Sequence, residues 1–510
     1  MAIVRAIESG NGEGRRLRLV SPANQESIGE LRVSTAAEVR ETVARARRAQ
    51  PAWQALGFDG RAAIMRRALE ILLADQEKYV AAIGRETGRS RYETILMEIF
   101  PACDSLAYFG KHAKRLLKDE KPSLHLLKNK KLVVSYEPLG VIGIITPWNG
   151  PFILSLNPSV QALMAGNAVV LKASELTPFS GRLVRELFDA AGLPKDVFGL
   201  VEGDGEVGAA LVEAGVNKIA FTGSVATGRK IAEACGRNLI PCTLELGGKD
   251  PMIVCSDADL DRAAKGCVFG AFLNAGQFCC STERVYVVSS VADAFTDKVL
   301  GHVRALRQGS SGEYDIGPMI SEKQLDVIEA HVADALARGA KVLVGGKRNP
   351  KLGPLFYEPT VLTDVTHAMR VMREETFGPI LPIVRVRDEQ DALEMANDSE
   401  YGLSSTLWTR DEAKAVSLAK RIESGSVCVN DSSITYGVLE APFGGMKASG
   451  LGQVHGKDGL KNYCFAKSIV IDRFQLKEER AWYPYSGDKV EMLQKVMHWV
   501  WGTRLGRLLA

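Results

Sequence analysis

Short, continuous apolar runs that alternate with segments of helical length constrain this chain more than any other feature. Four such runs are Val141–Thr146, Ala168–Lys172, Val197–Val201 and Lys218–Thr222. An unbroken apolar run, in contrast to one that alternates with polar residues, is typical of a strand buried on both faces of a parallel sheet. The repeated strand–helix–strand pattern therefore predicts a doubly wound, Rossmann-type α/β domain.

A second alternating set lies between about Asp250 and Val429. Its expected strands are Met252–Cys255, Arg284–Val288, Lys341–Val344 and Ser426–Asn430. Because a chain of 510 residues corresponds to two or three domains of ordinary size, we expect two α/β domains that join near residues 245–250.

Helical patterns fill residues 34–117 and also separate the later strands. Thr35 and Glu38 form a capping-box pair, which predicts a helix over Ala36–Gln50. The segment Ser321–Gln324 predicts the start of another helix in the second alternating set.

Composition excludes several classes of protein. The 46% apolar and 25% charged residues are typical of a globular chain, and 64 Lys+Arg against 61 Asp+Glu argue against a dedicated nucleic-acid binder. The basic run at 111–131 then indicates a solvated face or an exposed hairpin.

Nine cysteines without a CxxC pair predict neither a disulfide framework nor a thiolate metal site, so no metal is expected. With neither a leader nor an 18-residue apolar stretch recognised, we expect a cytoplasmic protein.

The C-terminal segment, Lys477 to Ala510, differs in character from the rest of the chain. It is rich in aromatic residues. If it is helical, its basic residues lie off a single apolar stripe, which contains Val490, Leu493, Met497, Val500 and Leu508. A basic amphipathic helix of this kind can pack on its own protein, cap a groove or lie on a membrane. Packing on its own protein is the more common outcome, and membrane association stays open.

Two glycine segments are candidates for binding a phosphate group. The fingerprint GxGxxG occurs at Gly203, Gly205 and Gly208, between an expected strand and an expected helix. The segment Phe221–Gly228 also runs from strand into helix; there Gly223 permits close backbone approach and Ser224 can cap the helix. The sequence pattern alone does not choose between them.

Three polar residues are candidates for catalysis. Cys279 lies in Asn274–Ser281, where a thiol exposed at a turn could act as a nucleophile, although a single cysteine is more often structural. Glu245 lies in an apolar stretch beside two glycines, where burial would raise its pKa toward that of a useful base. Asn149, between two prolines, could donate a hydrogen bond to an oxyanion.

Together these segments resemble the NAD(P)-dependent aldehyde dehydrogenase superfamily, from about Pro22 to Ile471 and in the family's order. The resemblance implies that Cys279 attacks the aldehyde carbon, that Asn149 holds the resulting oxyanion, and that Glu245 activates the water that hydrolyses the thioester. It also implies a substrate tunnel that contains Gly150, Ile153, Leu154, Asn157, Phe278, Cys280 and Phe443.

The resemblance assigns the cofactor residues as well. Lys172 and Glu175 would hold the adenosine ribose, and a carboxylate there favours NAD over NADP because it repels a 2′-phosphate. Ser224, with Gly223, would meet the pyrophosphate, so that Gly203–Gly208 becomes a nearby loop. The remaining implied contacts are Trp148 beside the site, and Glu375 and Phe377 at the nicotinamide ribose.

Some positions depart from the family pattern. Gly150 and Asn157 replace bulky aromatic residues of many members, which predicts a medium, long-chain or bulky aldehyde. Asn157 also replaces an Arg of NADP-type succinate-semialdehyde enzymes. Pro158 and Val454 replace a Lys and a Glu that carry the proton away from the base in some members, and the neighbouring His455 is a candidate substitute.

The family frame also predicts the division of the chain. It assigns residues 1–117 and 138–247 to the NAD-binding domain, 248–447 to the catalytic domain, 118–137 and 460–475 to a bridging β element, and 476–510 to an amphipathic extension. The bridging element implies a homodimer or homotetramer. Two alternatives remain: a CoA-acylating semialdehyde dehydrogenase, disfavoured by Glu245, and a non-catalytic dinucleotide-binding or structural member.

Overall fold

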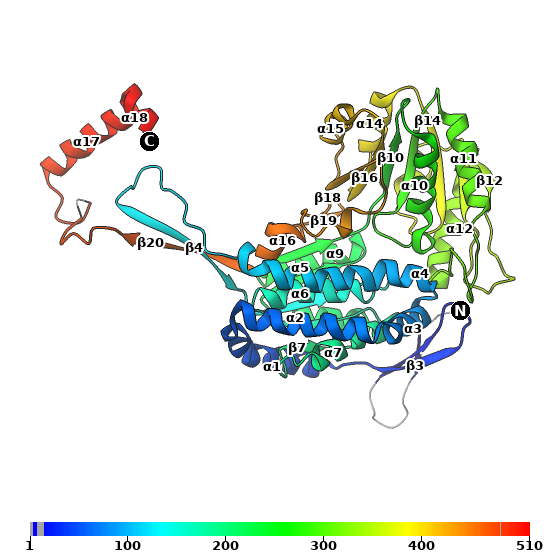
Figure 1. The fold of residues 1–510 in the computed structure, drawn as a ribbon, viewed down its shortest axis with the longest axis horizontal. Helices are drawn as coiled ribbons and strands as arrows, with labels where there is room; N and C mark the ends of the chain where they lie inside the picture. Colours follow the sequence, from blue (N-terminus) through cyan, green and yellow to red (C-terminus); the bar gives the residue numbers. More distant parts are fainter. Residues whose placement is uncertain (1–3, 8–14, 480, 510) are drawn as a thin grey trace.

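The computed structural model describes residues 4–7, 15–479 and 481–509. Two largely parallel sheets form the body, while a two-stranded arm and a helical C-terminal tail extend away from it (Figure 1). Residues 1–3 and 8–14, part of the N-terminal segment expected to carry no leader, lie outside the described residues, as do 480 and 510 of the predicted extension.

The first sheet contains the strands predicted as continuous apolar runs. Its order is β19-β9-β8-β5-β6-β7, in which all neighbours are parallel except the antiparallel pair β19 and β9. The strands are β5 (Val141–Ile145), β6 (Ala168–Lys172), β7 (Phe198–Leu200), β8 (Lys218–Thr222), β9 (Cys242–Glu245) and β19 (Gly450–Leu451). Every residue of β5 and β6 is buried, so both faces of the sheet are covered, as their apolar composition predicted.

Helices from the N-terminal half of the chain surround this sheet. They are α1 (Ala36–Ala55), α2 (Gly57–Ala74), α3 (Gln76–Thr87), α4 (Arg91–Thr94), α5 (Phe100–Leu116), α6 (Ile153–Met164), α7 (Pro178–Ala190), α8 (Gly205–Val212) and α9 (Val225–Arg237), with a π-helical turn η1 (Ile95–Ile99) before α5. The predicted capping box is confirmed, because Thr35 Oγ1 accepts from Glu38 N at 3.2 Å and Glu38 Oε2 accepts from Thr35 N at 2.8 Å. The helix runs on through Pro51, past its predicted end at Gln50.

The second sheet has the order β12-β13-β14-β11-β10-β16-β17, with only β12 antiparallel to its neighbour. Its strands are β10 (Asp250–Val254), β11 (Thr282–Val288), β12 (Lys341–Val344), β13 (Thr360–Thr363), β14 (Ile380–Val386), β16 (Ser404–Trp408) and β17 (Ser426–Val429). Its helices are α10 (Leu260–Phe272), α11 (Ala292–Arg304), α12 (Glu322–Ala337), α13 (Arg370–Arg373), α14 (Glu389–Asn397) and α15 (Glu412–Ala419). Ser321 Oγ accepts from Gln324 N at 3.3 Å, which confirms the predicted start of α12.

Smaller elements complete the body. An antiparallel sheet joins β1 (Val4–Ile7), β2 (Arg16–Val20) and β3 (Ser27–Arg32), and a two-stranded sheet joins β15 (Tyr401–Gly402) and β18 (Met446–Lys447). The short helical segments are η2 (Leu273–Gly276), η3 (Thr435–Gly437) and α16 (Gly456–Lys461).

The arm contains strands from both segments that the family frame assigned to one bridging β element, 118–137 and 460–475. Strand β4 (Lys130–Pro138) pairs along its whole length with β20 (Cys464–Asp472), a segment more than 300 residues away in sequence. Within 118–137 the structure gives only the isolated bridge between Glu120 and Val134. A local sequence pattern cannot reveal this pairing, because the partner strand comes from the far end of the chain.

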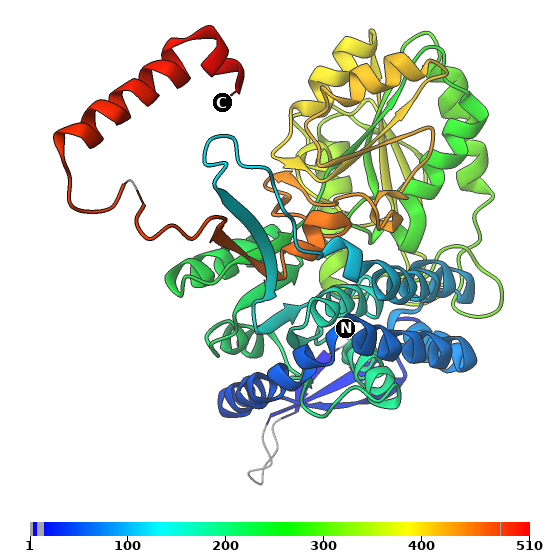
Figure 2. The ribbon, with the colours of Figure 1, turned by 60° about the vertical axis from the view of Figure 1, so that its left-hand side comes forward.

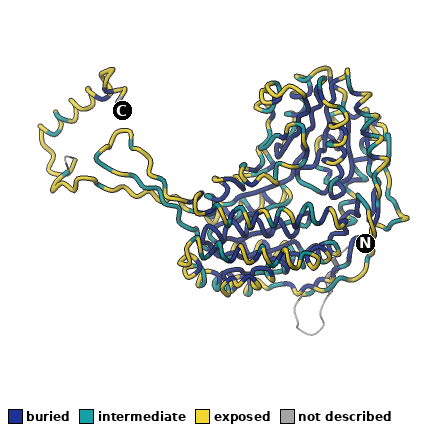
Figure 3. The backbone as a smooth tube through the Cα atoms, in the orientation of Figure 1, coloured by how far each residue is buried: buried dark blue, intermediate teal, exposed yellow. Residues whose placement is uncertain are grey.

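The tail does not pack on the body, although that was the favoured expectation. Helices α17 (Gly487–Gly502) and α18 (Arg504–Leu509) stand beyond the arm (Figures 1 and 2). The tail and β20 are mostly exposed, whereas β4 is largely half-buried (Figure 3). Within α17 only Val500 is buried. Lys130 joins the tail to the arm through an ion pair with Glu479 at 2.5 Å. Among the described helices, none combines the length and apolar character required to cross a bilayer.

Candidate active site

One large cavity lies where loops of the two sheets meet, and it has a volume of about 1250 Å³. Loops that follow β5, β6, β8 and β9 of the first sheet line it, together with loops that precede β11 and β14 of the second. The carboxyl ends of parallel strands are the usual position for ligands in such folds. The structure brings to this cavity every residue predicted for catalysis or cofactor binding: Trp148, Asn149, Lys172, Glu175, Gly223, Ser224, Glu245, Cys279, Glu375 and Phe377.

The Cys279 loop has an unusual backbone. Asn274, Ala275 and Gly276 have φ values of 53°, 55° and 74°, and two successive non-glycine residues in this region are sterically disfavoured. Side-chain hydrogen bonds stabilise the turn: Asn274 Nδ2 donates to Gln277 O at 2.9 Å, and Gln277 Oε1 accepts from Ile320 N at 2.8 Å. The turn leaves Cys279 half-buried at the edge of the cavity.

A buried ion pair, not anticipated from the sequence, connects the Asn149 and Cys279 loops. Arg89 donates to the carbonyl of Asn149 and to Asn274 Oδ1 at 2.8 Å, and pairs with Glu98 at 2.6 Å. Glu98 Oε2 accepts from Phe152 N and Ile153 N, at 3.1 and 2.8 Å. The two charged side chains are 2% and 0% exposed. One guanidinium therefore fixes both loops, as its planar array of donors allows.

Glu245 ends β9 and is buried. Burial raises its pKa to about 8, because a charged carboxylate is poorly solvated there. Such a value suits a general base that works near neutral pH.

A second buried ion pair, also missed in the sequence, supports the Glu375–Phe377 loop. Lys249 Nζ contacts Glu283 Oε2 at 2.5 Å and Thr376 Oγ1 at 3.1 Å. Glu283 in turn accepts from the backbone N–H groups of Thr376 and Phe377, both at 2.8 Å. Glu375 Oε1 accepts from Gly248 N at 2.9 Å, and burial raises the Glu375 pKa to about 8. These contacts set the positions of the carboxylate and ring predicted to meet the nicotinamide ribose.

The other wall of the cavity has features that fit a dinucleotide. Ser224 caps α9 by accepting from Thr227 N at 3.4 Å, so the positive end of this helix lies at the cavity, where anions bind favourably. Lys172 and Glu175 pair at 3.1 Å. Trp148 and Phe377 meet edge to face with centroids 5.4 Å apart. Gly205 and Gly208 line the same cavity, so both glycine segments converge on it.

The residues predicted for a substrate tunnel do not line the large cavity, and they fall into three groups. Cys280 and Phe443 form a buried apolar cluster with Leu403, packed against Phe278, Cys279, Tyr436 and Val454; the Sγ atoms of Cys279 and Cys280 are 3.8 Å apart. Ile153 and Leu154 are buried at the start of α6, shortly after Gly150. A Cβ added at Gly150 would meet the Leu154 side chain at 3.0 Å.

Asn157 belongs to an internal hydrogen-bond network. It accepts from Ser105 Oγ at 2.8 Å, and its Nδ2 lies 3.3 Å from Tyr436 OH and 2.6 Å from His455 Nε2. Burial lowers the His455 pKa to about 3. The ring therefore stays neutral near physiological pH, which argues against His455 as the substitute proton carrier.

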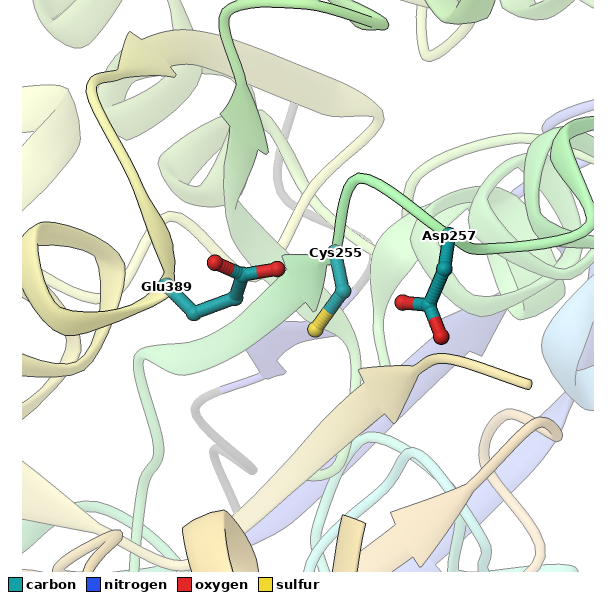
Figure 4. Close-up of side chains that lie close together, drawn as sticks. All are labelled: Cys255, Asp257 and Glu389. Carbon is teal, nitrogen blue, oxygen red and sulfur yellow. The ribbon is translucent and has the colours of Figure 1, made fainter. Parts of the chain in front are cut away.

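A group of potential metal ligands lies outside this cavity. Cys255, Asp257 and Glu389 place their ligand atoms within 4.8 Å of one another (Figure 4). However, Lys414 Nζ lies 2.6 Å from Asp257 and 3.4 Å from Glu389, so an ammonium group already compensates the carboxylates. Burial raises the Cys255 pKa to about 12, which further disfavours the thiolate that a metal requires.

Known proteins agree with this architecture. The sequence model of the aldehyde dehydrogenase family matches residues 9–469. A Methylomonas protein named 4,4'-diapolycopene aldehyde oxidase is 39% identical over 490 residues, 95% of this chain and 91% of its own. A Mycolicibacterium smegmatis protein with the provisional name succinate-semialdehyde dehydrogenase [NADP(+)] is 42% identical over 445 residues, 86% of each chain.

A solved structure of Mycobacterium tuberculosis aldehyde dehydrogenase complexed with NAD+ superposes with a TM-score of 0.85. It is 33% identical, and the match covers 91% of this chain and 96% of that one. The chain therefore belongs to the aldehyde dehydrogenase family and has that family's mixed α/β fold.

Proposed function

We propose that this protein oxidises an aldehyde to the carboxylic acid with NAD, through a covalent intermediate on Cys279. The observation that carries the proposal is the convergence of Cys279, Glu245, Asn149 and the N-terminus of α9 on one cavity. A cysteine, a base and an amide donor in one cleft are the groups that acyl transfer through sulfur requires.

Each residue has a defined task in this reaction. The Cys279 thiolate attacks the aldehyde carbon, and the carbonyl oxygen becomes an oxyanion that Asn149 and the Cys279 backbone N–H stabilise. NAD, when bound, accepts the hydride that the tetrahedral carbon releases, which leaves a thioester on sulfur. Glu245 takes a proton from water, the hydroxide attacks the thioester, and the thiolate leaves as the acid forms.

The choice of NAD rests on Glu175. It lines the cavity beside Lys172, and a carboxylate at the adenosine ribose accepts from a 2′-hydroxyl and repels a 2′-phosphate. The named relatives differ in cofactor, since one carries NADP(+) in its name and one structure holds NAD+, so this preference belongs to the proposal.

For the substrate we propose a medium, long-chain or bulky aldehyde. The side chains gathered around Cys279 are mainly apolar, as in the cluster of Cys280, Leu403 and Phe443. The relative named 4,4'-diapolycopene aldehyde oxidase also matches 95% of this chain. A succinate-type substrate would require a cationic group for its second carboxylate.

The arm and the tail support proposals about assembly. A two-stranded ribbon is rarely stable alone, and β20 exposes Phe465, Ile469, Val470 and Ile471. We therefore propose a homodimer or homotetramer in which a second copy covers the arm.

The exposed apolar side chains of α17, with Lys489 and Lys495 nearby, suit peripheral contact with a lipid surface.

Kinetics of Cys279→Ser and Glu245→Gln test the activity, with Cys103→Ser as a cysteine control outside the cavity. We expect no NADH from Cys279→Ser with any member of an aldehyde panel. Glu245→Gln should form one equivalent of NADH and then hydrolyse the acyl-enzyme about 100- to 10,000-fold more slowly. Turnover that depends on added CoA would indicate the acylating alternative, and absence of NADH from the native protein would indicate the non-catalytic one.

A further inference from the structure

A second, smaller cavity lies behind Glu245. It measures about 20 Å³ and is bounded by β5, β8, β9 and α6, and by Tyr463 just before β20. Glu245 lines both this cavity and the large one, whereas Cys279 lines only the large one. A volume of roughly 10–15 Å³ suffices for one water molecule, so the small cavity has room for a single water beside Glu245, in a space that Cys279 does not line.

Three buried polar atoms belong to residues that line this small cavity. They are Glu245 Oε1, Gln161 Oε1 and Tyr463 OH, on side chains of residues that are 6%, 0% and 1% exposed. None of the three has a hydrogen-bond partner among the residues that the structure describes. Gln161 Nε2 donates to Asn157 Oδ1 at 3.3 Å, which assigns the other end of the amide as the free acceptor. Buried polar atoms are almost always hydrogen-bonded, and a single water in the cavity that all three residues line is one partner they can share.

We propose that one water molecule in this cavity bridges Glu245, Gln161 and Tyr463, and that the latter two are positioning residues for the base. In this arrangement each of the three unpaired atoms has a hydrogen-bond partner. The water donates one hydrogen to Glu245 Oε1 and the other to Gln161 Oε1, and its oxygen accepts from Tyr463 OH. Three hydrogen bonds are the usual number for a buried water.

Two other polar side chains near Glu245 already have hydrogen-bond partners, so Gln161 and Tyr463 are the residues available to bind the water. Tyr436, which also lines the cavity, accepts from Asn157 Nδ2, and His455 Nε2 is bound to the same amide. Lys218, which does not line the cavity, has its Nζ 5.9 Å from the centre of the Tyr463 ring. Burial raises the pKa of both Tyr436 and Tyr463, so both phenols remain neutral and able to donate.

The consequence concerns the charge of Glu245, and it rests on the proposed role of Glu245 as the base. Burial alone disfavours the carboxylate, whereas a hydrogen bond donated to Oε1 favours it. The bridging water therefore offsets part of the effect of burial and keeps more of the base ionised. It also orients the carboxylate, since one oxygen is held at the rear cavity while the other remains available to the hydrolytic water.

Tyr463→Phe tests this inference because it removes one oxygen atom and keeps the ring. We expect acyl-enzyme hydrolysis in a single turnover to slow about 2- to 13-fold at pH 7, the range that one hydrogen bond contributes. The pH midpoint of that step should rise, while the NADH burst, which reports the earlier steps, should not change. Gln161→Met should act in the same direction. Tyr357→Phe, which removes a buried tyrosine hydroxyl in the second sheet region, is the matched control.

Three other results would overturn the inference. Unchanged hydrolysis and pH midpoint in both variants would show that the water has no role in positioning Glu245. Equal slowing of burst and hydrolysis would indicate general loss of structure. A crystal structure of the full chain without a water bonded to all three atoms would exclude the bridge. Failure of the proposed function is distinguishable, because then Glu245→Gln would itself leave hydrolysis unchanged.

Discussion

The Lys249–Glu283 pair gives a quantitative test of how the cofactor wall is built. In Glu283→Gln the amide oxygen can still accept from one of the N–H groups of Thr376 and Phe377, which bind separate carboxylate oxygens, whereas the amide NH2 faces the other and the Lys249 charge loses its partner. The two residues are 1% and 3% exposed. Removing one partner of such a pair costs about 3–5 kcal/mol, because the buried lysine must then either keep its charge without a partner or give up its proton on folding.

The loss of stability should also depend on pH. Burial lowers the Lys249 pKa in the folded protein, and the charge of Glu283 is the main opposing influence. Without that charge we expect Lys249 to be neutral when folded and protonated when unfolded, where its pKa is about 10.4. Folding then releases a proton, so stability rises with pH by about 1.4 kcal/mol per unit below the unfolded pKa. The destabilisation should therefore be largest at pH 6 and smaller at pH 8.

Chemical denaturation followed by tryptophan fluorescence at pH 6, 7 and 8 measures this effect. The double variant Lys249→Met with Glu283→Gln should recover most of the stability, since no charge is then buried. Asp261→Asn, which breaks the exposed pair with Lys298, should leave the midpoint almost unchanged. A pH-independent loss in Glu283→Gln, or no recovery in the double variant, would refute the reasoning.

Other predictions address the remaining parts of the site. Acyl-enzyme hydrolysis should increase with pH through about 8, because burial raises the Glu245 pKa and the base acts as carboxylate; a flat profile from pH 6 to 9 would contradict this. Arg89→Lys keeps the charge but not the fork that reaches Asn149, and should lower kcat/KM about 100-fold without changing cofactor affinity; unchanged kcat/KM would disprove the positioning role. Glu175→Ser should raise the ratio of NADP to NAD use, and a constant ratio would refute the ribose assignment. Deletion of 477–510 should reduce liposome binding, and unchanged binding would count against a lipid role.

The sequence determined the features that depend on neighbouring residues. Continuous apolar runs identified β5, β6 and β8, because strands covered on both faces have no polar side to alternate. The Thr35–Glu38 box and the Ser321 cap act within one helical turn. The motifs around Cys279 and Glu245 were recognisable because each is a short contiguous segment.

The tertiary structure alone decided how those segments are held. Arg89 reaches Asn149 and Asn274, and Lys249 reaches Glu283, across distances in sequence that no local pattern spans. The pairing of β4 with β20 joins segments from opposite halves of the chain, and the family frame, not a local pattern, placed these segments in one element. Charged residues in a sequence normally indicate solvent exposure. Only packing shows which of them are buried in pairs, because the ionisation and the role of a buried charge depend on groups brought together by folding.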